Sequence, residues 1–183
     1  MSTVAALEKE IKMQLDFLEQ FVPQKRLPVS KQKKAIFCGT GDSFASAQLA
    51  EVFSQFRAKA HDPLDLIKNR RMLQGRDLYL VSVSGNTVSN IRLGKLAKRT
   101  VAITTNGSSK LARACKRIIL LKFDSTSIQT SGSISFLASA LACLSLVSRY
   151  EIRNVSGIYR AAKSAARRIS LGGKIYVLGS LYT

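Results

Sequence analysis

Two short loops rich in glycine and hydroxyl residues follow predicted buried strands. Residues 39–43 (GTGDS) come after the apolar run 35–38, and residues 82–87 (SVSGNT) come at the end of the apolar run 78–83. Glycine lets the backbone approach a ligand closely, hydroxyls donate hydrogen bonds, and free N–H groups at a helix start attract anions. The two loops therefore predict a phosphate cradle without a charged ligand. Ordinary strand-to-helix turns and caps are the alternative reading of the same residues.

The glycine spacing does not fit the common nucleotide motifs. Residues 39–44 contain G-x-G, but Phe44 stands where a dinucleotide fingerprint needs its third glycine. No Gly-Lys-Ser/Thr triplet is present, so a Walker A loop is not predicted. The single His and the three scattered cysteines lack metal-ligand spacing. The sequence therefore predicts neither a cofactor nor a metal.

Alternating strands and helices must position these loops. Apolar runs predict short strands, with helical patterns between them, at 35–38, 58–60, 78–83, 101–104 and 118–121. Because parallel strands need crossover helices, we expect an α/β three-layer sandwich with a five-stranded parallel sheet. Both glycine loops would then lie at the carboxyl edge of that sheet, where ligands bind in such folds.

Further helices flank the predicted sheet. Apolar residues at helical spacing predict a helix over 7–22, capped by Ser2 or Thr3 and ended by Pro23. Residues 24–34 are expected to form a solvated basic connector. The uncharged segment 125–148 predicts a buried core helix, because its continuous apolar part is too short to span a bilayer. A helix over 155–169 and a last strand over 174–178 complete the expected elements.

The ordered set of loops resembles the sugar isomerase (SIS) domain family. The resemblance rests on residues 39–43, 82–87 and 102–112 (AITTNGSSKLA) in that order, and the S-x-S-G-x-T loop is its most specific part. Residues 9–14 (KEIKMQ) look like the first helix of the glucosamine-6-phosphate synthase branch. The resemblance covers about residues 4–150 and implies a five-stranded parallel αβα sandwich that binds a sugar phosphate. The expected ligand is a hexose or amino-hexose phosphate.

The resemblance also implies roles for individual residues. The side chains of Ser82, Ser84 and Thr87 would bind the phosphate, joined by Ser43 from the first loop. Three glycines, Gly39, Gly41 and Gly85, would shape the approach of the ligand. Two hydroxyl residues of a further loop, Thr130 and Ser131, would touch the sugar.

A general base for aldose–ketose isomerisation is not evident. Such a reaction needs a positioned Glu or His, yet residues 78–183 contain only the acids Asp124 and Glu151, neither at a matching position. Glu51 is expected on the solvated face of its helix. His61 is a weak catalytic candidate, with an exposed loop histidine as the alternative. Activity as an isomerase and a non-catalytic phosphosugar sensor therefore both stay open.

The expected organisation has three parts. These are an N-terminal helix and connector (1–34), an SIS phosphosugar-binding domain (35–150), and a C-terminal helix with an extra strand (151–183). Residues 173–180 (GKIYVLGS) look like the first strand of a second SIS unit. We expect a homodimer, in which two copies replace two tandem units and cover exposed strand edges.

The charge balance predicts an anionic partner. The chain carries 29 Lys and Arg against 11 Asp and Glu, a formal net charge of +18. A sugar phosphate fits this charge, and nucleic acid is a less favoured alternative because no recognised DNA- or RNA-binding motif is present. The three unpaired cysteines favour a reducing cytoplasm, and no signal peptide or membrane partner is expected.

Overall fold

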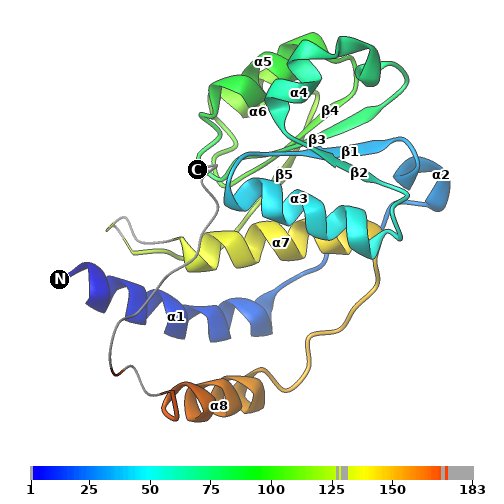
Figure 1. Ribbon diagram of the computed structural model, residues 1–183. Coiled ribbons are helices and arrows are strands. Elements are labelled where there is room, and N and C mark those ends of the chain that lie inside the picture. The colour runs from blue at the N-terminus through cyan, green and yellow to red at the C-terminus, as the bar shows by residue number, and fades with distance from the viewer. Residues whose placement is uncertain (1, 127, 129–131, 170–171, 173–183) are drawn as a thin grey trace.

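A single parallel sheet organises the protein. The computed structural model describes residues 2–126, 128, 132–169 and 172. Its sheet has the order β2-β1-β3-β4-β5, and every neighbouring pair is parallel (Figure 1). The strands are β1 (Ala35–Cys38), β2 (Lys59–His61), β3 (Asp77–Val81), β4 (Thr100–Thr104) and β5 (Arg117–Leu120). The predicted α/β sandwich with a five-stranded parallel sheet is confirmed.

The central strands are apolar because helices cover both of their faces. All residues of β1 and β4 are buried, as are the last four of β3. Phe37 and Tyr79 stack on neighbouring strands with ring centroids 4.8 Å apart. The edge strands β2 and β5 are more exposed, with Ile118 and Leu120 of β5 each more than 40% accessible. The sheet centre is therefore the rigid part, and it carries the glycine loops.

Two helical layers sandwich the sheet. One layer contains α3 (Asp42–Phe53) and α7 (Ser133–Val147), which pack on Phe37 and Ile103 among others. The opposite layer contains α4 (Pro63–Lys68), α5 (Val88–Leu96) and α6 (Lys110–Ala114), packed on a second core around Leu78 and Leu80. The predicted core helix over the uncharged segment is confirmed as α7. Among the residues that the structure describes, no helix is long and apolar enough to cross a bilayer.

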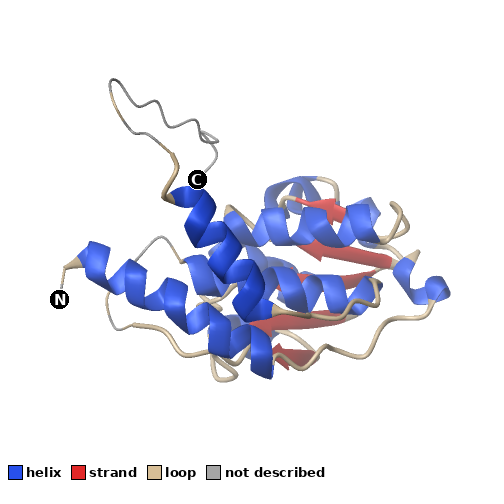
Figure 2. Ribbon diagram, turned by 90° about the horizontal axis from the view of Figure 1, so that it is seen from below, coloured by secondary structure: helices blue, strands red, loops and turns tan. Residues whose placement is uncertain are grey.

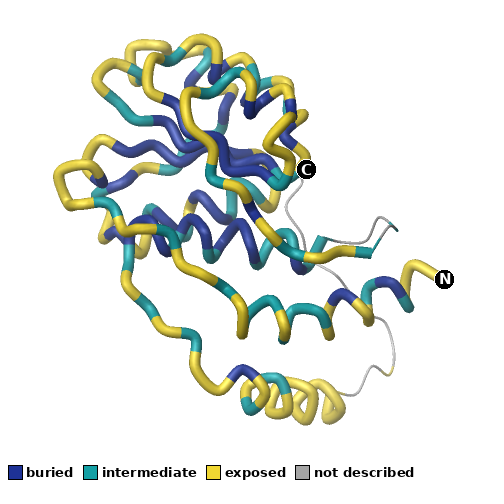
Figure 3. The backbone as a smooth tube through the Cα atoms, turned by 180° about the vertical axis from the view of Figure 1, so that it is seen from behind, coloured by how far each residue is buried: buried dark blue, intermediate teal, exposed yellow. Residues whose placement is uncertain are grey.

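Two more helices lie outside α7. In α1 (Thr3–Gln20) the hydroxyl of Ser2 accepts a hydrogen bond from the Ala5 N–H, which confirms the predicted cap. Both α1 and α8 (Val155–Ala166) lie on the α7 side of the sheet (Figures 1 and 2). Most of α8 is exposed, with only Val155 buried (Figure 3). The basic residues of α8 therefore face solvent.

The segment predicted as a solvated connector is mostly exposed, but Gln32 and Leu27 attach it to the core. It contains a short helix, α2 (Val29–Gln32), and the side chain of Gln32 is fully buried. The Gln32 amide donates to the carbonyl oxygens of Leu27 (2.8 Å) and Val147 (3.1 Å), and the Leu27 N–H donates to the Leu146 carbonyl (2.8 Å). The sequence did not reveal this attachment, because the hydrogen bonds use backbone carbonyls at the end of α7, which leave no trace in side-chain composition.

The other differences are local. The helical segment between β2 and β3 is divided at Asn69 into α4 and the 3-10 helix η1 (Arg70–Leu73). Helix α3 ends before Ser54, because Gln55 and Phe56 have positive φ angles. The strand predicted over 174–178 lies outside the described residues.

Candidate functional site

The two glycine loops meet at the carboxyl edge of the sheet. Strand β1 pairs with β2 on one side and β3 on the other, so the chain order reverses between β1 and β3. Cys38, the last residue of β1, lies opposite Leu80 of β3. The loop after each strand therefore starts at the same topological switch point, where open α/β sheets bind ligands. The predicted juxtaposition of the loops is confirmed.

The hydroxyls of the second loop pair with each other. Ser82 is 3% exposed, and its Oγ lies 2.9 Å from Oγ1 of Thr87. Thr87 is the N-cap residue of α5, yet its side chain makes no capping hydrogen bond to that helix. Because the Thr87 hydroxyl is directed to Ser82, the first turn of α5 has no side-chain acceptor.

Several backbone N–H groups at this loop have no protein acceptor in the described part of the chain. They include those of Ser84, Val88, Ser89 and Asn90. Helix α5 also has no acidic residue in its first turn. Free N–H groups together with the positive end of the helix dipole make such a terminus attractive to an anion. The side chain of Asn90 is used elsewhere, because its Nδ2 donates to the Val81 carbonyl at 2.8 Å.

Gly85 allows the loop to lie tightly against the next one. Its φ is +66°, which favours glycine, and its carbonyl accepts a hydrogen bond from the Leu111 N–H at 3.0 Å. A Cβ at this position would lie 2.1 Å from Ser109 Oγ and 2.9 Å from Thr104 Oγ1. Thr104 and Ser109 were not predicted as site residues, although both belong to the residues on which the family resemblance rests.

The first loop is built differently. A Cβ on Gly39 would lie 2.6 Å from the backbone of Ser43, so glycine is needed where β1 meets α3. Gly41 has a φ of +55° and begins α3, whose first turn carries Asp42. The N–H groups of Ser43 and Phe44 already donate to Thr40 and Gly41 carbonyls. The first turn of α3 therefore offers an anion fewer free N–H groups than the first turn of α5, and its Asp42 carboxylate repels an anion.

The candidate acid–base groups lie in different surroundings. His61 ends β2 opposite Cys38, so it lies at the carboxyl edge beside the first loop and is half-buried instead of being in an exposed loop. Glu51 does not face solvent freely: its carboxylate pairs with Lys59 Nζ (3.2 Å) and accepts from the Ala60 N–H (3.3 Å). This pairing ties α3 to β2. Glu151 pairs with Arg153 on the surface.

The predicted sugar-contacting residues Thr130 and Ser131 lie outside the described residues. Close to them in the chain, the Thr126 hydroxyl donates to a carboxylate oxygen of Glu10 at 2.9 Å. Glu10 lies on α1 and is only 3% exposed. Glu10 was not predicted as a buried acid, although it belongs to residues 9–14, which resemble the first helix of the synthase branch.

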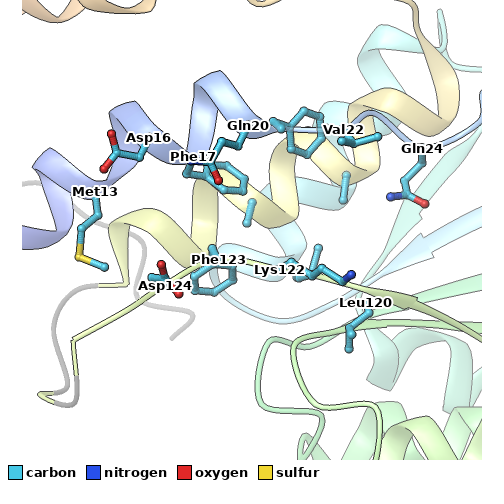
Figure 4. Close-up of a pocket in the computed structure, with 14 residues that line it drawn as sticks. Met13, Asp16, Phe17, Gln20, Val22, Gln24, Leu120, Lys122, Phe123 and Asp124 are labelled. Carbon is cyan, nitrogen blue, oxygen red and sulfur yellow. The ribbon is translucent and has the colours of Figure 1, made fainter.

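A cavity of about 700 Å³ lies elsewhere, between α1, α7 and the chain after β5 (Figure 4). Aromatic side chains of Phe17, Phe21 and Phe123 line it, together with the carboxylates of Asp16 and Asp124. None of the residues of the two glycine loops lines this cavity. Its lining is largely apolar and holds two carboxylates against one cation, Lys122, so it is less suited to a phosphate than the start of α5.

The cysteines are structural. Cys38 and Cys143 are fully buried, and Cys115 is half-buried with its pKa raised mainly by burial. Burial likewise raises the pKa of Cys143, to about 12, and raises that of Cys38, where Asp62 and Asp65 add to the effect. Thiols held protonated in this way are poor nucleophiles at neutral pH. Within the described ranges, no group of three or more His, Cys, Asp or Glu side chains gathers as metal ligands would.

Comparisons with known proteins identify the fold. No family model matches the sequence, and no curated protein matches it either. Among solved structures, a proposed sugar-phosphate isomerase from Listeria monocytogenes superposes with a TM-score of 0.54 at 15% identity, covering 90% of both chains. An Escherichia coli CFT073 protein in complex with A5P gives 0.51 at 19% identity, covering 86% of this chain and 91% of that one.

A third structure, glucosamine-6-phosphate deaminase from Thermotoga maritima, gives a TM-score of 0.54 at 23% identity. The match covers 78% of this chain and 47% of the deaminase. At these identities the likeness concerns the fold, and the closer resemblance to the synthase branch stays a prediction. The chain thus has the fold of structures described as phosphosugar isomerases and a phosphosugar deaminase.

Proposed function

We propose that the protein binds a hexose or amino-hexose phosphate, with the phosphate at the start of α5. The observation that carries this proposal is the set of unpaired N–H groups of Ser84, Val88, Ser89 and Asn90 beside the paired hydroxyls of the same loop. Positive helix ends and hydroxyls favour a dianionic phosphate over an uncharged sugar. The phosphosugar ligand and the isomerase descriptions of the structural relatives support the same ligand class.

The direct test is calorimetry with fructose 6-phosphate, glucosamine 6-phosphate and inorganic phosphate. We expect Ser84→Ala and Thr87→Val to weaken binding by about tenfold, since a hydrogen bond to a charged group contributes about 1.5–3 kcal/mol. Ser30→Ala is the matched control, because Ser30 is exposed on α2, before β1. A wild-type protein that binds none of the three ligands would refute the proposal.

We also propose isomerase activity on this ligand, with non-catalytic phosphosugar sensing as the alternative. Sensing is favoured by the positions of the candidate bases: Glu51 is paired with Lys59, Glu151 with Arg153, and Asp124 lines the separate cavity. An assay of fructose 6-phosphate and glucose 6-phosphate interconversion separates the two. Turnover lost in His61→Gln supports an isomerase, whereas binding without turnover supports a sensor.

We also propose that the protein acts as a homodimer. The exposed apolar residues of the edge strand β5, Ile118 and Leu120, support this, since an open strand edge invites pairing. Sedimentation equilibrium at micromolar concentration should give twice the chain mass of 20.0 kDa. A single species at the monomer mass would reject the dimer without affecting the binding proposal.

A further inference from the structure

One peptide group in the second loop is turned against the pattern of its strand. In a parallel ladder, alternate residues of a strand bond to opposite neighbours. The N–H groups of Leu78 and Ser82 donate to carbonyls before and within β4, whereas the Asp77 N–H donates to the Lys34 carbonyl beside β1. By this alternation the carbonyl of Val83 would face β1, and therefore the crevice at the switch point.

The Val83 carbonyl instead faces β4, where three hydrogen bonds hold it. It accepts from the Thr105 N–H at 3.0 Å, from Thr104 Oγ1 at 2.9 Å and from Thr105 Oγ1 at 2.7 Å. Thr104 is fully buried and Thr105 is half-buried, so both hydroxyls are shielded from competing water. This arrangement fixes the orientation of the peptide group between residues 83 and 84.

The orientation determines where the Ser84 N–H points. The peptide bond between residues 83 and 84 is trans, so the Ser84 N–H points opposite to the Val83 carbonyl, away from β4 and toward the side of β1. This N–H has no acceptor among the described residues. A reversed peptide would place a carbonyl oxygen in the crevice, and its negative end would repel a phosphate.

We propose that Thr104 and Thr105 are positioning residues that turn the Ser84 N–H into the crevice as a phosphate donor. The inference rests on the proposed phosphosugar binding and adds two residues that need not touch the ligand. Their hydroxyls hold the peptide group between residues 83 and 84 so that its N–H, and not its carbonyl, faces the crevice. Hydroxyl side chains are required here, because an isosteric valine cannot donate to the Val83 carbonyl.

The test combines affinity with a signal from the Ser84 amide itself. Wild-type protein and the variants Thr104→Val, Thr105→Val and the double variant are titrated with fructose 6-phosphate and inorganic phosphate, by calorimetry and by amide NMR. The double variant should bind about tenfold more weakly, and each single variant should lose less because the other donors remain. The Ser84 amide should shift with phosphate in the wild type and lose that shift in the double variant.

Two controls separate positioning from general stability. Thr100→Val removes a hydroxyl from the other end of β4, where Thr100 Oγ1 accepts from the Lys116 N–H at 3.1 Å. It should lower the urea midpoint without changing phosphate affinity. Thr104→Ser and Thr105→Ser keep the donor and should bind like the wild type.

The outcomes distinguish this inference from the function on which it rests. If the wild type binds no phosphate ligand, the proposed function fails and the inference fails with it. If the wild type binds but the folded double variant binds equally well, only the inference is overturned. The inference would also be overturned if Thr100→Val lost as much phosphate affinity as the double variant. It would be overturned as well if the chemical shift of the Ser84 amide did not change when the wild type binds phosphate.

Discussion

Replacing Gly85 by alanine tests whether the second loop must be packed as closely as the structure has it. The new Cβ would lie 2.1 Å from Ser109 Oγ and 2.4 Å from Ser109 Cβ, so Ser109 must move. Ser109 caps α6 by accepting a hydrogen bond from the Ala112 N–H at 3.1 Å. The substitution therefore disturbs both the φ of +66° and a helix cap.

The expected cost follows from these two effects. A left-handed conformation costs a non-glycine residue about 1–2 kcal/mol, and losing a serine cap costs about 1 kcal/mol. We expect Gly85→Ala to lower the free energy of unfolding by about 2–3 kcal/mol in urea titrations. Phosphate affinity should fall as well, because the neighbouring Ser84 N–H belongs to the same loop.

Gly75 provides the matched control for this substitution. Its φ is +70°, but an added Cβ would meet nothing within 4 Å. Gly75→Ala should therefore show only the conformational cost, about 1–2 kcal/mol, and leave phosphate binding unchanged. Combining Gly85→Ala with Ser109→Gly should recover part of the lost stability, since glycine is nearly as good a cap. If Gly85→Ala costs no more than Gly75→Ala and binds phosphate normally, the close-packing argument is refuted.

The remaining predictions concern stability. Burial raises the pKa of Cys143 from 9.0 to about 12, so the folded state holds a proton that the unfolded chain releases. The contribution of this thiol to the free energy of unfolding should be constant below about pH 8.5 and should fall by about 1.4 kcal/mol per pH unit above pH 9. In urea titrations, Cys143→Ala should make the fall of stability with pH less steep. An unchanged slope would contradict this prediction. Gln32→Ala should cost about 2–3 kcal/mol, because it leaves the Leu27 carbonyl without its side-chain donor and the Val147 carbonyl with only the donor from Arg26. The exposed Gln48→Ala should change stability by less than about 0.5 kcal/mol, and an equal cost in both variants would mean that the Gln32 hydrogen bonds are not responsible.

The loops illustrate how far local sequence reasoning can go. Residues 82–87 were predicted as a phosphate loop because glycine and hydroxyl types determine local conformation and hydrogen-bonding capacity. Which of the two helix starts offers more free donors could not be predicted. That difference arises because the Ser43 and Phe44 amides donate within their own turn, whereas the first amides of α5 do not.

The sequence by itself determined the strand order along the chain, the buried core helix and the two loops. Each of these follows from apolar periodicity or from the steric freedom of glycine, which act between near neighbours. Only the tertiary structure decided that the connector is held by Gln32, that Glu51 pairs with Lys59, and that Thr104 and Thr105 turn the peptide before Ser84. These contacts join residues from separate elements, and a hydroxyl or amide side chain does not specify its partner until the packing of those elements brings one within reach.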